Sequence, residues 1–306
     1  MTLLLISQLI PLLLLIALGY GLGHWLKVDA RSLAMVAIYV LAPVVNFGAI
    51  ARLDFQSSYL LLPPLLFGLA AGMAVLGHWL AGKVFADNTR NLVAMAASTG
   101  NTGYFGAPLV LALFGPQALG VYFLMNFAIA LCETTIGYYY GARGQHDMRD
   151  SVKKVLSLPS NYAVLLGLLY NSLHLELPPL FIGWWERFTG AWVILGMMII
   201  GVALSQAGGW RANKRLTGLL FAIRFGLWPA ATWGLVLLDR AVFGLFEPMV
   251  HAMLLLIGSV PLAGNTVTFA TQFHLRPGEA AAVVLESTLF ATAFIPLVFW
   301  LAGVGN

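Results

Sequence analysis

The sequence predicts an all-α, polytopic membrane protein in which ten transmembrane helices form two repeats of five helices with opposite orientation. Three observations lead to this fold class. Hydrophobic residues make up 60% of the 306 residues and charged residues only 9%, whereas a soluble domain carries roughly 25% charged residues. Ten segments are apolar and long enough to cross a bilayer. Two of these segments, the fourth of each half, are interrupted by glycine, proline and asparagine.

The ten predicted spans are separated by polar connections. A helix needs about 20 apolar residues to cross the hydrocarbon core, and the segments that meet this requirement are residues 3–25, 31–51, 59–82, 90–114, 117–141, 159–175, 180–206, 214–238, 249–274 and 279–302. The fourth and fifth spans come from one uncharged run, residues 91–132, which as a single helix would be about 63 Å long, twice the core of a bilayer. The sequence Gly115-Pro116-Gln117 supplies the turn that divides this run.

The distribution of lysine and arginine predicts the orientation of the chain. If the N-terminus lies outside the cytoplasm, the cytoplasmic loops hold twelve of these residues and the outer loops and helix ends hold three. Because positive residues concentrate on the cytoplasmic side, we expect both termini to be extracytoplasmic. Residues 142–158 then form a cytoplasmic linker between a first repeat at 1–141 and a second repeat at 159–306. With five spans in each half, the second half enters from the opposite side, so the repeat has to be inverted.

The two interrupted spans carry their helix-breaking residues at 98–108 and 258–266. Pro108 and Pro261 are 153 residues apart, which is half the length of the chain. A proline in a helix removes a hydrogen bond and clashes with the carbonyl four residues earlier, and lipid offers no partner for the released backbone groups. We therefore expect non-helical backbone at 101–108 and 260–265, with the fourth and ninth spans crossing near the middle of the bilayer.

A pair of broken helices favours a binding site for an anion. Each break creates a second half-helix whose first N–H groups are unpaired and partially positive, and interrupted spans in corresponding positions of two halves are typical of the substrate site of secondary transporters. The alternative is that glycine and proline only kink these helices and that asparagines elsewhere join neighbouring helices. The candidate substrate-binding residues are Asn46, Asn101, Thr102, Gly103, Pro108, Asn126, Pro261, Asn265 and Thr266.

Three ionisable residues lie deep inside the predicted spans, where a charge is expensive. Glu133 and Glu286 are candidates for carrying a proton or balancing charge beside the crossing; the alternative is a structural hydrogen bond made by a neutral or paired carboxyl group. Arg224 lies about ten residues into the eighth span and is a candidate for holding a second carboxylate of a substrate. Alternatively, Arg224 pairs with an internal acid or extends to the interface.

The sequence gives little support to other classes of function. The chain has one cysteine, Cys132, and its histidines lack metal-ligand spacing, so we expect no metal site and no cofactor. The motifs of membrane-embedded enzymes are absent from the sequence, and we expect no enzymatic activity. The net charge of +4 belongs to the loops and does not indicate a nucleic-acid partner. The expected partners are the lipid bilayer and a small carboxylate, and Gly-x-x-x-Gly sequences leave a homodimer open.

The residues of both breaks resemble those of a known family. Residues 101–109, Asn-Thr-Gly-Tyr-Phe-Gly-Ala-Pro-Leu, resemble the Asn-Thr-Gly-x-x-Gly-x-Pro motif in the fourth span of the auxin efflux carrier family. Residues 260–265, Val-Pro-Leu-Ala-Gly-Asn, are similar to the Met-Pro-x-Ala element in its ninth span, with Val260 where methionine is common. The number of spans and the polar central loop match as well, so the resemblance covers the whole chain.

This resemblance implies a fold, a function and a location. The fold is that of bile-acid symporters and sodium–proton antiporters, in which spans 1, 2, 6 and 7 form a scaffold and spans 3–5 and 8–10 form a transport domain. The implied function is secondary transport of a small organic anion, similar to malonate, malate or auxin, by elevator-type alternating access. The short central loop resembles that of bacterial members, which implies the bacterial inner membrane. A sodium- or proton-coupled symporter for another small solute and a channel-like pore are the alternatives.

Overall fold

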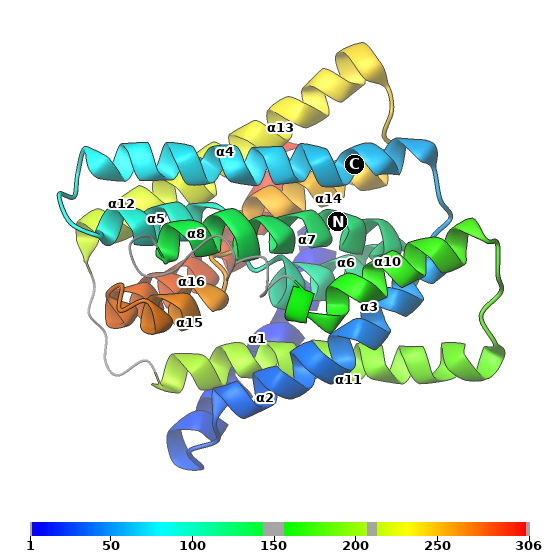
Figure 1. The fold of residues 1–306 in the computed structure, drawn as a ribbon, viewed down its shortest axis with the longest axis horizontal. Helices are drawn as coiled ribbons and strands as arrows, with labels where there is room; N and C mark the ends of the chain where they lie inside the picture. Colours follow the sequence, from blue (N-terminus) through cyan, green and yellow to red (C-terminus); the bar gives the residue numbers. More distant parts are fainter. Residues whose placement is uncertain (1, 143–155, 207–212, 304–306) are drawn as a thin grey trace.

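The computed structural model describes residues 2–142, 156–206 and 213–303, and all regular structure within these ranges is helical (Figure 1). Most of the predicted linker at 142–158 lies outside the described residues. In the first half the helices are α1 (Thr2–Trp25), α2 (Ala30–Val36), η1 (Ala37–Leu41), α3 (Ala42–Ala51), η2 (Ser57–Leu61), α4 (Leu62–Gly82), α5 (Thr89–Ala97), η3 (Thr102–Gly106), α6 (Ala107–Phe114), η4 (Pro116–Ala118), α7 (Leu119–Cys132), η5 (Glu133–Gly137) and α8 (Tyr138–Gly141). In the second half they are α10 (Pro159–Ser172), α11 (Pro179–Gln206), α12 (Lys214–Phe221), η6 (Ala222–Leu227), α13 (Trp228–Leu238), η7 (Asp239–Phe243), α14 (Pro248–Ser259), α15 (Asn265–Gln272) and α16 (Pro277–Leu301).

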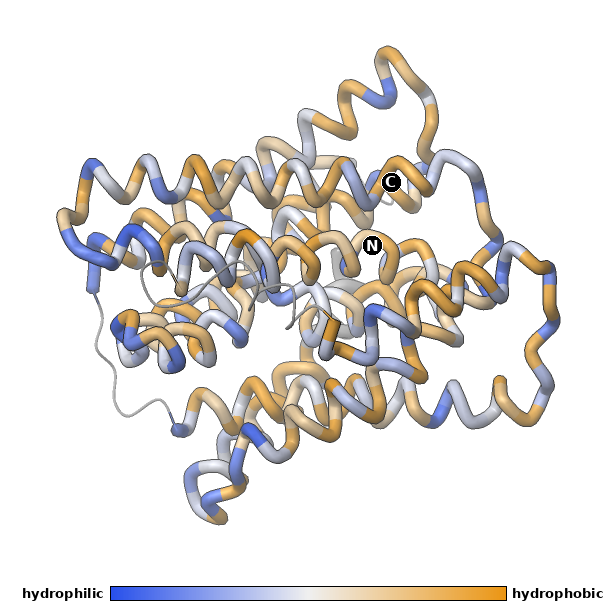
Figure 2. The backbone as a smooth tube through the Cα atoms, viewed as in Figure 1, coloured by the Kyte–Doolittle hydropathy of each residue, from blue (hydrophilic) through white to orange (hydrophobic). Residues whose placement is uncertain are grey.

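These helices follow the predicted spans closely, and the largest difference is in the eighth, which extends to Phe243 instead of residue 238. Within the described residues, six helices are long and apolar enough by themselves to cross a membrane. Two shorter apolar helices, Ile10–Trp25 and Pro248–Ser259, lie in the first and ninth predicted spans. Apolar residues line the lengths of the helices, and hydrophilic residues gather mainly at turns and helix ends (Figure 2). The chain is therefore a multi-pass membrane protein, and its division into an inverted repeat stays a prediction.

The helices pack in groups that bring distant parts of the chain together. Helix α1 packs along α11, α3 packs on α10, α4 packs on α5 and α7, and α15 packs on α16. Glycines allow the backbones of α1 and α11 to touch, because a Cβ atom added at Gly201 would lie 1.9 Å from the carbonyl oxygen of Ile16. Small residues at such contacts are typical of helix pairs in membranes.

Three prolines inside the spans follow widened, π-helical turns. The π-helical segments η1, η3 and η6 each end two residues before a proline, namely Pro43, Pro108 and Pro229. A π-turn shifts the hydrogen bonds from the carbonyl four residues earlier to the carbonyl five residues earlier. The proline ring, which would clash with the carbonyl four residues back, is thereby accommodated, and the helix continues past the proline.

Polar side chains connect loops at one end of the bundle. Arg276, which precedes α16, donates to Asp87 Oδ2 at 2.6 Å and to Glu279 Oε1 at 2.9 Å. Hydrogen bonds from Thr89 and then the Arg276 guanidinium lower the pKa of Asp87 to about 2. Asn213 at the start of α12 donates to the other oxygen of Glu279 at 2.7 Å. This network joins the beginnings of α5, α12 and α16.

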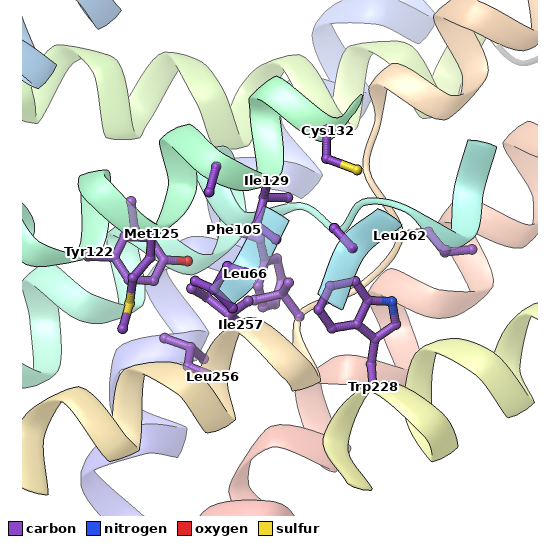
Figure 3. Close-up of a cluster of buried hydrophobic side chains, with 14 of the residues drawn as sticks. Leu66, Phe105, Tyr122, Met125, Ile129, Cys132, Trp228, Leu256, Ile257 and Leu262 are labelled. Atoms are coloured by element: carbon purple, nitrogen blue, oxygen red, sulfur yellow. The ribbon is translucent and has the colours of Figure 1, made fainter. Parts of the chain in front are cut away.

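The centre of the molecule is a core of buried side chains that surrounds the two interrupted spans. Side chains from α4, α7, α13 and α14 meet there, including those of Leu66, Ile129, Trp228 and Ile257, all of which are almost completely buried (Figure 3). The core also includes Phe105 and Leu262, which belong to the interrupted spans themselves. This packing fixes the non-helical backbone on the side that faces the core.

Candidate functional site

The two interrupted spans meet at their breaks. Helix α5 ends at Ala97 and η3 begins at Thr102, so residues 98–101 are not helical. Helix α14 ends at Ser259 and α15 begins at Asn265, so residues 260–264 are not helical. The backbone N–H of Asn101 in the first break donates to the carbonyl oxygen of Pro261 in the second at 2.8 Å. This hydrogen bond joins the two breaks directly.

The first break differs from the predicted one. We expected non-helical backbone at 101–108, but the break ends before Thr102, and Pro108 is a buried residue in the first turn of α6. The reason is the π-turn of η3, which accommodates the proline without unwinding the helix. Pro261 lies inside the second break, which agrees with the predicted range of 260–265. Pro108 thus lies inside a helix and Pro261 inside a break, although the two prolines are half the chain length apart.

Two residues of the eighth span hold the helix ends that lead into the breaks. Arg224 in η6 is fully buried and donates from Nε to the carbonyl oxygen of Val260 at 2.6 Å, and from Nη2 to that of Ile257. Trp228, one turn later, donates from Nε1 to the carbonyl oxygen of Ala97 at 2.8 Å. The Arg224 guanidinium carbon lies 4.9 Å from the centre of the Trp228 ring. Arg224 thus donates hydrogen bonds to carbonyl groups at the end of α14, and Trp228 donates one to a carbonyl group at the end of α5.

The helices that lead out of the breaks begin without side-chain caps. Neither Asn101 nor Gly264 makes a capping hydrogen bond, and among the described residues the backbone N–H groups of Gly103, Tyr104 and Asn265 have no hydrogen-bond partner. Gly264 and Asn265 are exposed, and Gly103 is half-buried. Both glycines face open space, because a Cβ atom added to either would have no neighbour within 4 Å. Two partially positive helix ends are therefore accessible.

Polar side chains surround these helix ends. Thr102 donates from Oγ1 to Asn126 Oδ1 at 2.6 Å, and the Tyr122 hydroxyl donates to the Thr102 carbonyl oxygen at 2.9 Å. Buried Thr266 Oγ1 has no hydrogen-bond partner in the part of the chain that the structure describes, and neither has the side chain of Asn101. The hydrogen-bonding capacity of these two side chains is therefore unused by the described residues.

Two of the other predicted residues, Glu286 and Asn46, make no hydrogen bond to either break within the described part of the chain. Glu286 is half-buried and accepts a hydrogen bond from Thr217 Oγ1 in the first turn of α12 at 2.9 Å. Asn46 is buried on α3. Glu133 is buried in η5, which packs against α5, the helix that leads into the first break.

Sequence reasoning missed three residues that position the breaks. Ser287 on α16 accepts a hydrogen bond from the backbone N–H of Leu262 at 3.1 Å, while Tyr122 and Trp228 hold the first break as described above. The sequence contained one signal for Ser287, a small polar residue beside the predicted Glu286 in an otherwise apolar span. Tyr122 and Trp228 carried no comparable signal, because aromatic residues are frequent in membrane spans for other reasons.

The helical bundle and its paired breaks define a multi-pass membrane protein of a transport class. The chain matches the family described as membrane transport protein over residues 4–301 and belongs to this family, as the resemblance to auxin efflux carriers predicted. It is 23% identical to an uncharacterized transporter of Methanocaldococcus jannaschii, a match that covers 94% of this chain and 96% of the relative. It is also 23% identical to an uncharacterized transporter of Methanothermobacter thermautotrophicus, covering 94% of this chain and 95% of the relative.

Proposed function

We propose that this protein is a secondary transporter that binds a small organic anion between the two breaks. The observation that carries the proposal is the pair of accessible, uncapped helix starts at Gly103 and Asn265. Because unpaired N–H groups at helix starts favour negative charge, a carboxylate is the simplest ligand for this arrangement. Mono- and dicarboxylates similar to malonate, malate or auxin are the proposed substrates.

Side chains at the breaks give the proposed site its directional contacts. Asn101, Thr266 and the amide nitrogen of Asn126 have hydrogen-bonding capacity that no described residue uses. Thr102, Pro108 and Pro261 would act mainly by shaping the backbone around the ligand. Proton or charge coupling is proposed for Glu133, which is buried in η5 against α5, and for Glu286, whose neighbour Ser287 accepts a hydrogen bond from Leu262 of the second break.

Elevator-type alternating access is the proposed mechanism. In this proposal α1, α2, α3, α10 and α11 form the scaffold, and the remaining helices form a transport domain in which spans 4 and 9 cross. The packing of α1 on α11 and of α3 on α10 supports a scaffold unit. Contacts of α4 with α5 and of α15 with α16 support a second unit. The proposed location is a bacterial inner membrane with both termini outside the cytoplasm.

A thermal-shift screen tests the proposed substrate class. Purified protein is heated with acetate, malonate, malate and indole-3-acetate, with and without sodium and across pH. Because a ligand that binds only the folded state raises the unfolding temperature with its concentration, we expect at least one carboxylate to stabilise the protein in a saturable manner. Stabilisation by none of these acids, at any pH or sodium concentration, would contradict the proposal.

A further inference from the structure

Arg224 is a buried positive charge without a negative partner. The side chain is 1% exposed, and among the described residues no carboxylate lies within ion-pair distance of it. Its hydrogen bonds go to two neutral carbonyl groups, those of Val260 and Ile257. A buried charge is costly unless it is compensated, so this arrangement requires a reason.

The Arg224 guanidinium lies beside the backbone of both breaks. Its contact with Val260 places it beside the second break. It also lies against the first break, because a Cβ atom added at Gly100 would be 2.6 Å from Arg224 Cζ. The next residue, Asn101, bonds to Pro261 across the two breaks. Arg224 is therefore adjacent to the backbone of both interrupted spans.

The position of Arg224 also changes the balance of helix dipoles. The ends of α5 and α14 carry partial negative charge and the starts of η3 and α15 carry partial positive charge. The charge of Arg224 offsets the partial negative charge at the end of α14, and the Trp228 N–H group donates a hydrogen bond to the end of α5. The positive helix starts are then left without an opposing charge nearby, and the part of the guanidinium charge that the end of α14 does not offset adds to them.

We propose that Arg224 is a positioning residue whose fixed charge makes the crossing of the two breaks select anions without touching the bound ligand. This inference rests on the proposed function and assigns its charge selectivity to one side chain. It differs from the expectation that Arg224 holds a carboxylate directly: the side chain is buried, and its Nε and Nη2 groups are bonded to backbone carbonyls. A bound carboxylate would supply the missing counter-charge.

The test compares each acid with its uncharged amide. Dissociation constants are measured for acetate, malonate, malate and indole-3-acetate and for the corresponding amides, using wild type, Arg224→Lys and Arg224→Gln. At an effective dielectric constant of about 20, a unit charge about 10 Å away changes the affinity for another charge by roughly tenfold or more. We expect Arg224→Gln to lose roughly tenfold of the preference for acid over amide and Arg224→Lys to retain most of it.

A matched control lies at the far end of the same span. Arg240 is exposed, so Arg240→Gln removes an equal charge away from the breaks and should leave the preference unchanged. The inference is overturned if Arg224→Gln keeps the wild-type preference, or if it weakens acid and amide equally, as a purely structural role would. A wild-type protein that binds no acid more tightly than its amide would instead refute the proposed function.

If the Arg224 variants do not fold, a second pair of variants tests the same effect of the guanidinium charge. Trp228→Glu places a carboxylate beside the guanidinium and cancels its charge while Arg224 keeps its carbonyl contacts. Trp228→Gln removes the same indole without adding charge. We expect the preference for acid over amide to be lost in Trp228→Glu relative to Trp228→Gln, and equal preferences in the two variants would overturn the inference.

Discussion

Asn101 and Asn265 stand at the starts of the helices that leave the two breaks, and each carries a side-chain amide that can orient a carboxylate. A side-chain hydrogen bond is worth about 0.5–3 kcal/mol, depending on charge. We therefore expect Asn101→Ala and Asn265→Ala each to weaken carboxylate binding roughly 3- to 100-fold. Titration calorimetry of the purified variants measures this change, and unchanged affinity in both variants would remove the breaks from the substrate site.

At Gly100 the absence of a side chain makes room for Arg224. An added Cβ atom would lie 2.6 Å from Arg224 Nη2, so the guanidinium would have to shift away from the carbonyl groups of Val260 and Ile257 that hold it. Because overpacking a buried site costs about 1–3 kcal/mol, Gly100→Ala should lower the unfolding temperature clearly. Gly103→Ala is the matched control, since open space surrounds that position and alanine favours helix. Equal unfolding temperatures for the two variants would contradict the described contact.

The sequence singles out Arg224 as unusual but does not predict which groups its side chain contacts. Composition and depth were sufficient to identify Arg224 as unusual, because a charge inside a span is expensive. The partners of its guanidinium depend on how the eighth and ninth spans pack, and no local pattern contains that information. The same holds for Ser287, whose hydroxyl becomes important only because Leu262 lies next to it.

At the scale of elements, the contact between α1 and α11 depends on glycine. A Cβ atom at Gly201 would overlap the carbonyl oxygen of Ile16, so Gly201→Ala has to push the two helices apart. We expect a loss of stability of about 1–3 kcal/mol or more, measured as the unfolding temperature in detergent. Gly190→Ala on the same helix has no neighbour within 4 Å and should have little effect. A similar loss in both variants would indicate a general effect of alanine in α11.

Helix boundaries were predictable, whereas the position of the first break was not. The lengths of the apolar runs set where a span can begin and end, and for this reason nearly every predicted span agrees with a helix to within a few residues. The first break could not be located from its proline, because the π-turn of η3 allows the helix to continue through Pro108. The second break was located correctly, since it has no such turn before Pro261.

At the scale of the whole molecule, the excess of basic residues in alternate loops predicts the orientation. Glu176, which is exposed in the connection before α11, should lie outside the cytoplasm, and Asp147 in the central linker should lie inside. Cysteines introduced at these two positions can be labelled in intact cells with an impermeant thiol reagent. Cys132 is fully buried and gives little background. We expect labelling at position 176 only; labelling at 147 from outside would reverse the topology.

The central claim, that the two breaks together bind and carry an organic anion, is tested most directly by counterflow in proteoliposomes. Vesicles containing the purified protein are loaded with an unlabelled carboxylate from the binding screen, and uptake of the labelled acid is followed as its outside concentration is varied. Our account predicts saturable uptake that unlabelled acid inside accelerates, with the half-saturating concentration raised at least roughly 3-fold in Asn101→Ala. Uptake that rises linearly with concentration and shows no acceleration, or no uptake at all, would contradict it.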